Sequence, residues 1–485
     1  MKILIAASEA FPFCKTGGLA DVTGALAQVF SRTPDAEVVL FLPRYRNVGG
    51  GAFSLKAAGG SFLIPVGGRI ETATISRVQW GKAAVYFIEN PKYFDRPGMY
   101  RAAAGDYEDN DERFIFFSRA VLEGAKFIGF KPDVIHCHDW QTGLVPAYLR
   151  TLYRIDSFYA KTASVFTIHN IAYQGMFPKE TLLKAGFSWM DFTPERLEYY
   201  GGVNFMKAGL AFSDLITTVS PTYAGEIQYR PEFGHGMEGL LKHRTADLFG
   251  ILNGIDEEIW DPATDTFLER GYELKSFARG KAASKKTLQK ELGLEENKDL
   301  ILAGVVSRLD RQKGLDVLLP VLPEFLDKMQ LVVLGAGDPG LSDAFTSLAS
   351  ANPRRVAFRN GFDETLAHRI YGASDVFLMP SRFEPCGLSQ MIAMRYGSLP
   401  VVTRTGGLKD TVYYNGEPKD SNGFAIDAPD SGQLKSVLGH IVSLYGWREN
   451  WNMMVRNAMK GDYAWHRSAE AYIKLFNIAA QRRQL

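Results

Sequence analysis

Cysteine is scarce in this sequence, and its scarcity excludes two kinds of small protein. Only Cys14, Cys137 and Cys386 occur in 485 residues, odd in number and far apart. A disulfide framework or a zinc knuckle needs closely spaced cysteines, so neither is expected. A reducing, cytoplasmic location fits such a chain best.

The sequence also lacks a long apolar run and an excess of either charge. It has no stretch of about 20 apolar residues, which a membrane span would need, and the apolar run at residues 3–7 is too short for a secretory signal. Lysine and arginine number 55 against 54 acids. No general attraction for nucleic acid or an anionic membrane is therefore expected. Any anionic ligand must be held by a local cluster of cations.

Short, buried-looking apolar runs alternate with longer amphipathic stretches, a pattern typical of parallel sheets with crossover helices. The sequence therefore predicts an α/β protein with two Rossmann-like, doubly wound domains. The expected strands are residues 2–7, 38–42, 134–136, 164–168 and 215–219 in the first half, and 300–306, 331–334, 356–359, 376–379 and 400–402 in the second.

The alternation falters between Trp260 and Leu300, where Asp261 and Pro262 break the pattern. We expect one domain over residues 1–253 and a second over residues 254–461. Residues 281–290 are rich in lysine and predict a surface helix. Further helices are expected at residues 315–325, 364–371 and 388–396.

Two Thr-Gly-Gly-Leu turns, at residues 16–19 and 405–408, each follow an expected strand and open an expected helix. A helix N-terminus offers unpaired N–H groups, and glycines let a phosphate or sugar hydroxyl approach them. Lys15 and Arg404 stand just before the two turns and add positive charge. One such turn is as often a plain structural turn, but the pair, one in each domain, favours a site shared by both.

Two further loops follow strands of the second half. Residues 307–316 carry Arg308 and Lys313, which can hold a pyrophosphate together, although a solvated charged loop has the same composition. Residues 380–390 carry Glu384, a carboxylate suited to sugar hydroxyls. Cys386 has no histidine close to it in sequence, so a packing or contact role is favoured over a thiolate role.

Residues 134–141 contain two histidines, a cysteine and an aspartate, which invites a metal hypothesis. On an extended strand His136 and His138 face one side and Cys137 the other, so sugar recognition by Asp139 and Trp140, or plain packing, is favoured. Residues 167–175 include His169 and suit polar contacts to a carbohydrate, but a structural histidine also fits.

Taken in order, these motifs resemble the bacterial glycogen synthase and plant starch synthase family over nearly the whole chain. The resemblance implies the two-Rossmann GT-B fold around a central cleft, with residues 462–485 forming a last helix that returns to the first domain. It implies glucosyl transfer from ADP-glucose to the non-reducing end of an α-1,4-glucan, with retention and without a metal or other cofactor.

The resemblance also assigns residues to roles. The catalytic group is Lys15, His169, Arg308, Lys313 and Glu384. Donor binding is expected from Lys15, Gly18, Arg308, Lys313, Glu384, Cys386, Gly387, Thr405, Gly406 and Gly407. Contacts to the acceptor or glucose are expected from Asp21, Asp139, His169, Asn170, Tyr173, Gln174 and Asn253.

The chain departs from the wider retaining GT-B pattern at Ile392, where many relatives carry a second glutamate that binds ribose; Gln390 lies nearby. The residues alone leave two alternatives open: a UDP-glucose-dependent transferase of the same fold, or a non-catalytic glucan-binding protein. A nicotinamide dehydrogenase is disfavoured, because residues 8–18 lack the Gly-x-Gly-x-x-Gly pattern.

Overall fold

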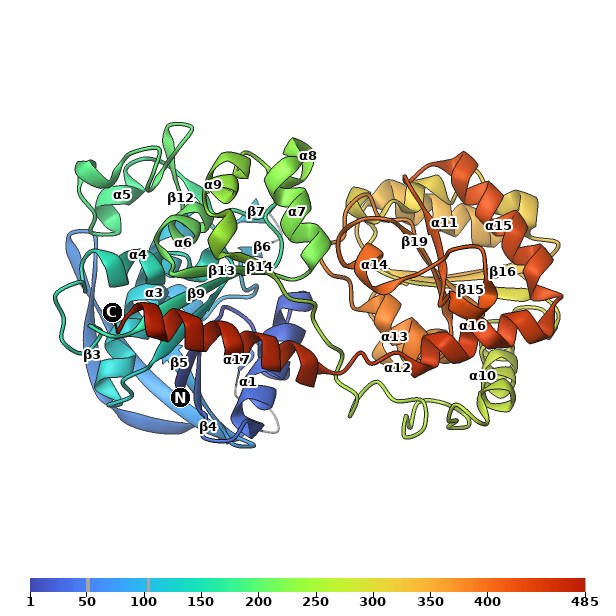
Figure 1. The fold of residues 1–485 in the computed structure, drawn as a ribbon, viewed down its shortest axis with the longest axis horizontal. Helices are drawn as coiled ribbons and strands as arrows, with labels where there is room; N and C mark the ends of the chain where they lie inside the picture. Colours follow the sequence, from blue (N-terminus) through green and yellow to red (C-terminus); the bar gives the residue numbers. More distant parts are fainter. Residues whose placement is uncertain (49–52, 103–104, 485) are drawn as a thin grey trace. The chain divides into compact units, whose positions relative to one another are not determined.

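The chain folds into two compact units, each built on its own sheet (Figure 1). The computed structural model describes residues 1–48, 53–102 and 105–484. The first unit comprises Met1–Val219, Ala224–Ile251 and Trp465–Leu485, and the second comprises Ser220–Tyr223 and Leu252–Ala464.

The first unit contains a nine-stranded sheet in the order β14-β13-β9-β8-β1-β2-β5-β4-β3. Its strands from β14 to β5 pair in parallel, and β4 and β3 extend the edge antiparallel. The strands are β1 (Lys2–Ala6), β2 (Glu37–Pro43), β3 (Lys56–Val66), β4 (Arg69–Trp80), β5 (Ala83–Glu89), β8 (Val134–His138), β9 (Ala163–Ile168), β13 (Leu215–Thr218) and β14 (Leu248–Gly250).

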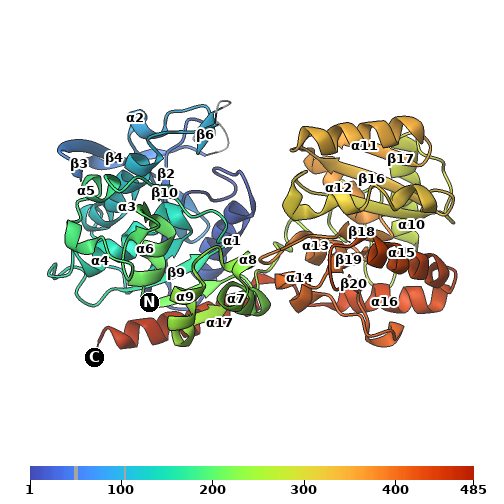
Figure 2. The same cartoon turned by 90° about the horizontal axis from the view of Figure 1, so that it is seen from above.

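The second unit contains a six-stranded, fully parallel sheet in the order β17-β16-β15-β18-β19-β20. In Figure 2 its labelled strands run from β17 at the top to β20 at the bottom. Counted along the chain, this is the 3-2-1-4-5-6 order of a doubly wound nucleotide-binding fold. The strands are β15 (Ile301–Val306), β16 (Met329–Gly335), β17 (Val356–Asn360), β18 (Val376–Met379), β19 (Leu399–Thr403) and β20 (Phe424–Ile426).

Helices connect the strands and cover the sheets, as parallel pairing requires. The longer ones are α1 (Gly18–Arg32), α3 (Asn110–Phe127), α4 (Leu144–Arg150), α6 (Phe205–Phe212), α7 (Pro221–Tyr229), α10 (Phe277–Glu291), α11 (Pro339–Ala351), α12 (Glu364–Ala373), α13 (Ser389–Arg395), α15 (Ser431–Tyr445), α16 (Arg448–Lys460) and α17 (Trp465–Arg482). The shorter ones are α2 (Pro91–Phe94), α5 (Thr181–Lys184), α8 (Pro231–Gly234), α9 (Glu238–His243) and α14 (Gly406–Thr411). The predicted α/β class with two doubly wound domains is confirmed.

The last helix, α17, packs within the first unit, as the resemblance implied. It is the red helix that lies along the first unit in Figure 1. Tyr472 and Phe476 place their rings against Phe30 of α1 and His136 of β8. Both rings are fully buried, so this helix belongs to the core of the first unit.

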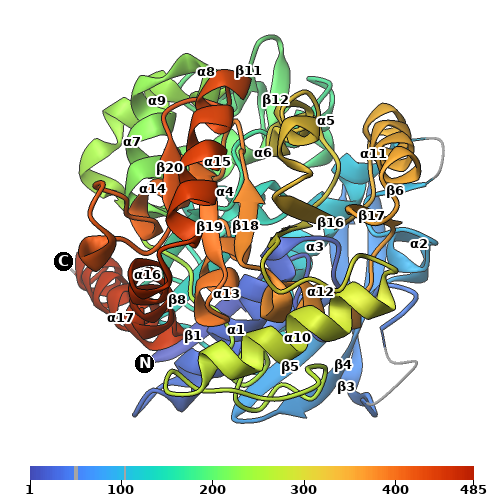
Figure 3. The same cartoon turned by 90° about the vertical axis from the view of Figure 1, so that its right-hand side faces the viewer.

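Two predictions about helices were wrong. Residues 315–325 form two short 3-10 turns, Leu315–Val317 and Leu322–Phe325, rather than one helix. The lysine-rich helix α10, which lies against α12 (Figure 3), is not a plain surface helix. Lys285 is buried and pairs with Asp375 at 2.7 Å. Lys281 is buried and donates to the carbonyls of Gly372 and Tyr396, and burial lowers its pKa to about 7.

Candidate active site

In both units several of the predicted site residues follow the strands at which the sheet order reverses. In the first unit these strands are β1 and β8, which are neighbours although six strands separate them in the sequence. In the second unit they are β15 and β18. Open α/β sheets bind ligands beyond the carboxyl ends of such strands. Each unit therefore presents its charged loops where a doubly wound sheet binds ligands.

The first glycine turn leads from β1 into α1 and leaves room beside its backbone. A Cβ added at Gly17 or Gly18 would meet no atom of the described residues within 4 Å. Lys15 stands beside the turn, and its ammonium contacts the Asp21 carboxylate at 2.7 Å while the side chain stays 40% exposed. The turn combines open space, a cation and a helix N-terminus, the features that suit an anion.

Sequence reasoning gave no role to Glu9, which holds this turn in place. Its buried carboxylate accepts hydrogen bonds from the Thr16 backbone N–H and hydroxyl, and from the Tyr100 hydroxyl at 2.6 Å. The sequence gives only a weak indication of this role, because a single acidic residue after the first strand forms no recognisable motif. Glu9 thus fixes the loop that carries Lys15.

The second glycine turn has the same Thr-Gly-Gly-Leu sequence but different surroundings. A Cβ at Gly406 would lie 1.9 Å from the Glu384 carbonyl oxygen, and one at Gly407 would lie 2.2 Å from that of Cys386. Gly406 also has a φ of +43°. These glycines are needed so that α14 can pack against the loop carrying Glu384. Arg404 turns to Asp427 at 3.2 Å.

Lys313 and Glu384 form the central contact of the second unit. The Lys313 ammonium lies 2.6 Å from Glu384 Oε2, and the Ser381 hydroxyl donates to the same oxygen at 3.2 Å. The two side chains are 18% and 8% exposed. A solvated charged loop, the alternative for residues 307–316, would leave Lys313 exposed. Instead, the lysine folds onto the buried carboxylate.

The other residues of these loops divide into exposed and buried. Arg308 is 54% exposed and contacts Asp310 at 3.2 Å, so its guanidinium can turn toward a ligand. Cys386 is buried, and burial raises the pKa of its thiol to about 12, which supports a contact role rather than a thiolate. Asn253 lies in the second unit beside this thiol. Gln390 is buried and donates to the Cys386 and Gly387 carbonyls.

Asp139, directly after β8, has an unusual backbone geometry. Its φ of 54° and ψ of −178° lie in a region that is almost reserved for glycine. Its carboxylate accepts the backbone N–H of His169 at 2.8 Å. Burial raises the pKa of Asp139 to about 7, against the N–H groups of His169 and Asn170, which lower it. Such strain is typical of functional sites.

Tyr173 and Gln174 line a cavity of about 750 Å³ in the first unit. Its wall includes Trp140 and Gly175, and a Cβ at Gly175 would lie 2.3 Å from the Trp140 ring. Tyr200 is 83% exposed at the same cavity. Aromatic surface beside amides and carboxylates is the composition of a carbohydrate site.

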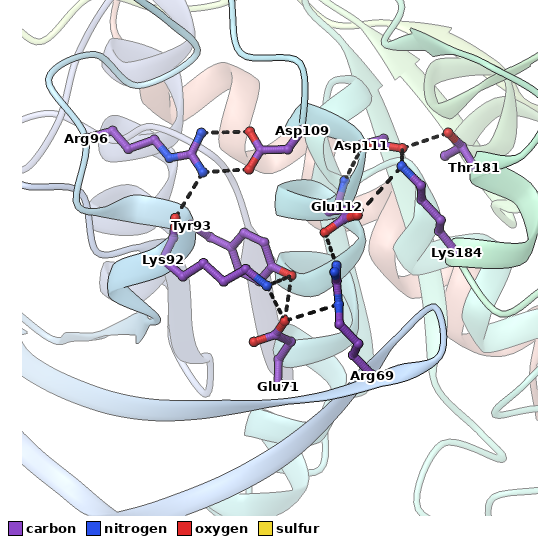
Figure 4. A network of polar contacts seen from close by, with 10 residues as sticks. All are labelled: Arg69, Glu71, Lys92, Tyr93, Arg96, Asp109, Asp111, Glu112, Thr181 and Lys184. Carbon is purple, nitrogen blue, oxygen red and sulfur yellow. Dashed lines mark hydrogen bonds and ion pairs between the residues drawn. The ribbon is translucent and has the colours of Figure 1, made fainter.

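One wall of the cavity is the loop at residues 106–110. Arg96 contacts both oxygens of Asp109, at 2.7 and 2.6 Å, within the polar network of Figure 4. The same guanidinium lies 4.8 Å from the centre of the Tyr107 ring, whose hydroxyl accepts the Gly98 N–H. The loop is therefore held by charge and by stacking.

The structure groups the predicted residues into separate clusters. Lys15, Gly18 and Asp21 form one, and Asp139, His169 and Asn170 a second, next to the cavity lined by Tyr173 and Gln174. Lys313, Glu384, Cys386, Gly387, Asn253 and residues 405–407 gather around one loop of the second unit. Arg308 contacts Asp310 of its own loop at 3.2 Å.

Neither a metal cluster nor a membrane helix appears in the described part of the chain. Across residues 1–48, 53–102 and 105–484, no group of three or more histidine, cysteine, aspartate or glutamate side chains could hold a metal ion. Among the same residues, a helix able to span a bilayer is absent.

Two doubly wound units with charged strand-end loops are the architecture of a two-domain glycosyltransferase, and comparison with known proteins gives the family. Residues 2–243 match the family model "Starch synthase catalytic domain", and residues 301–443 match "Glycosyl transferases group 1". A glycogen synthase of Elusimicrobium minutum is 53% identical over 98% of this chain and 99% of that one. Another, of Syntrophotalea carbinolica, is 46% identical over 99% of both.

Similar solved structures include a member of the same family and a more distant protein with the same fold. The catalytic domain of Arabidopsis thaliana starch synthase IV, solved with ADP and acarbose, is similar with a TM-score of 0.91 at 34% identity, covering 99% of both chains. A sucrose-phosphate synthase of Thermosynechococcus elongatus, at 17% identity and a TM-score of 0.63 over 98% of both chains, shares the fold. The chain belongs to the glycogen synthase and starch synthase family of glycosyltransferases.

Proposed function

We propose that this enzyme transfers glucose from ADP-glucose to the non-reducing end of an α-1,4-glucan, with retention at the anomeric carbon. The observation that carries the proposal is the Lys313–Glu384 pair at the strand ends of the second unit. It offers a cation for the donor's pyrophosphate beside a carboxylate for the glucose hydroxyls. Family membership and the ADP and acarbose in the starch synthase IV structure support it.

The cations supply the electrostatic part of catalysis. Breaking the glucose–phosphate bond leaves negative charge on the nucleotide, and Lys15, Arg308 and Lys313 are the cations proposed to stabilise it. Each well-placed donor is worth about 3 kcal/mol at a transition state. His169 contacts the sugar, and Thr405, Gly406 and Gly407 shape the donor side together with Cys386 and Gly387.

Retention follows from attack on the face that the nucleotide leaves. The bond from the anomeric carbon to the phosphate oxygen breaks, the bond to the acceptor oxygen forms, and the acceptor's proton passes to the departing phosphate. Glu384 is a poor nucleophile, because its carboxylate is buried against Lys313 and accepts from Ser381. A glucosyl group trapped on Glu384 or Asp139 would contradict this step.

The glucan is proposed to bind in the cavity of the first unit. Tyr173, Tyr200 and Trp140 offer aromatic faces, and Gln174 lines the same cavity. Sugar rings combine an apolar face with hydroxyl groups, so they match such a wall. Asp21, Asp139, Asn170 and Asn253 complete the proposed acceptor and glucose contacts. The three free thiols fit the cytoplasmic location that belongs to this proposal.

The proposal is tested by transfer of labelled glucose to glycogen from ADP-glucose and from UDP-glucose, with and without EDTA. We expect transfer from ADP-glucose, insensitive to the chelator. Preference for UDP-glucose would establish the alternative donor, and no transfer from either would refute the proposal.

Substitutions that remove the charges of Lys313 and Glu384 test whether this pair takes part in the transfer. Lys313→Met should lower transfer about 100-fold or more, and it should also lower stability because Glu384 stays buried without its partner. The double variant Lys313→Met with Glu384→Gln should recover the stability but not the transfer. Lys435→Met, which removes an exposed lysine paired with Glu324, is the control and should change neither.

A further inference from the structure

Three histidines of the first unit lie close together although the proposed reaction uses only one of them. His136 and His138 point to the same side of β8, with ring centres 4.0 Å apart. His169 follows β9, and its Nε2 lies 2.9 Å from Nδ1 of His138. His136 and His138 are fully buried, whereas His169 is partly exposed.

The contact between His138 and His169 requires one proton between the two nitrogens. Burial lowers the pKa of His138 well below its usual value and that of His169 to about 3, so both rings are neutral near pH 7. A neutral imidazole carries one N–H and one bare nitrogen. Two arrangements are therefore possible: either His138 donates to His169, or His169 donates to His138.

The surroundings of His138 decide between them. Its other nitrogen, Nε2, is buried and has no hydrogen-bond partner in the described part of the protein. If His169 donated, the proton of His138 would sit on this Nε2 as a buried N–H without an acceptor. A buried orphan N–H is rarer than an unused acceptor. The favourable arrangement places the proton of His138 on Nδ1, where it is shared with His169.

The hydrogen bonds of His136 lead to the same kind of assignment. Its Nε2 lies 2.6 Å from the Thr167 hydroxyl, which lies 2.6 Å from the Thr217 hydroxyl, while its Nδ1 has no partner among the described residues. The proton of His136 therefore belongs on Nε2, where it has an acceptor. Each buried ring places its N–H toward a partner and leaves the bare nitrogen in the core.

We infer that His138 is a positioning residue that fixes His169 in the Nδ1–H tautomer, so that His169 presents a hydrogen-bond donor to the substrate. With Nε2 of His169 occupied as an acceptor, the proton of this ring must lie on Nδ1. The ring can then donate to an oxygen of the bound sugar nucleotide or glucan. Asp139 holds the backbone of the same residue through its N–H. This role rests on the proposed function, but the tautomer itself does not.

The tautomer is read directly from the protein labelled with ¹⁵N-histidine. Loss of one set of signals in His169→Asn assigns the ring. We expect the Nδ1 of His169 at the shift of a protonated nitrogen and its Nε2 at the shift of a bare one, without any substrate. The opposite assignment in the wild type would overturn the inference, whatever the activity.

Variants then test the consequence. An asparagine amide reaches the position of a histidine Nδ1 and can still donate, whereas leucine cannot. His138→Leu should move His169 toward the Nε2–H form and lower kcat about ten-fold or more, with a smaller change in KM for ADP-glucose. His138→Asn should restore both the tautomer and most of kcat.

His136→Leu is the matched control, because it empties a neighbouring buried ring position but leaves the contact between His138 and His169. It should lower the melting temperature about as much as His138→Leu and leave the tautomer and kcat unchanged. Equal losses of kcat in the two leucine variants would reduce His138 to a packing residue. Absence of transfer in every protein, with the expected tautomer, would refute the proposed function and leave the tautomer assignment standing.

Discussion

At the scale of one residue, Asp139 combines two unfavourable features, a strained backbone and a buried carboxyl group. Its backbone conformation costs about 1–3 kcal/mol, and its carboxyl is buried. Both costs are tolerated because the carboxylate ties the end of β8 to the N–H of His169 after β9. Titration of this carboxyl near neutral pH is the measurable consequence.

We predict that Asp139 makes stability fall as pH rises from about 4 to 7. Its pKa is raised from 3.8 to about 7 in the folded protein, so the folded state keeps the proton that the unfolded state releases. The contribution is full below the unfolded pKa and lost as pH passes the folded pKa. Each pKa unit corresponds to about 1.4 kcal/mol.

Urea unfolding of the wild type and Asp139→Asn at about pH 4 and pH 8 measures this contribution. The amide does not titrate, so the variant should gain stability relative to the wild type at the higher pH. Parallel stability curves for the two proteins would show that the buried carboxyl is not the source of the pH dependence.

Individual residues also show where sequence reasoning stops. Lys313 and Glu384 stood out by their motifs, but their pairing depends on β15 and β18 being neighbours in the sheet. Glu9 carries no motif, and the motif of His138 suggested a metal rather than a contact with His169. Both roles depend on contacts that only the folded chain shows. The two Thr-Gly-Gly-Leu turns read alike, yet only the first leaves open space at its glycines.

At the scale of elements, buried parallel strands were the easiest to predict, because both faces are covered and the apolar run is continuous. β15 and β18 match their predicted runs within one residue. The antiparallel hairpin of β3 and β4 was missed, since its alternating, partly exposed pattern is weak. Residues 315–325 looked helical by period, but Pro320 and Pro323 interrupt regular α-helix.

The loop at residues 106–110 gives a prediction for one element. Arg96→Met removes the two contacts to Asp109 and the stacking on Tyr107. Without Arg96 the loop must be ordered when the glucan binds. If this weakens glucan binding by ~1 kcal/mol, KM for the glucan rises about five-fold. The kcat at saturating glucan should stay the same, because no proposed donor contact is touched.

Arg69→Met is the control for this loop. Arg69 belongs to the same network in Figure 4 but contacts Glu71 and Glu112, and none of these three residues lines the cavity. Steady-state kinetics with varied glucan should show no rise in KM for this variant. A rise as large as that of Arg96→Met would mean that the whole network, rather than the loop, sets glucan affinity.

At the scale of the whole molecule, the chain begins and ends in the same unit. Helix α17 closes the core of the first unit around Phe30 and His136, more than 300 residues from either in the sequence. The second unit has its own core, in which Trp451 of α16 packs on Phe424 and Tyr445. Each unit should therefore lose stability separately when its own core is damaged.

We predict that Phe476→Ala destabilises the first unit by about 3–5 kcal/mol, because it removes a fully buried ring. Hydrogen exchange resolved along the chain should show faster exchange in β8 and β9 and unchanged exchange in β15 and β16. Trp451→Ala should give the reverse pattern, since its ring lies in the second core. If either variant accelerated exchange equally in both sheets, the two units would unfold as one cooperative block. The C-terminal helix would then stabilise the whole enzyme, not the first unit alone.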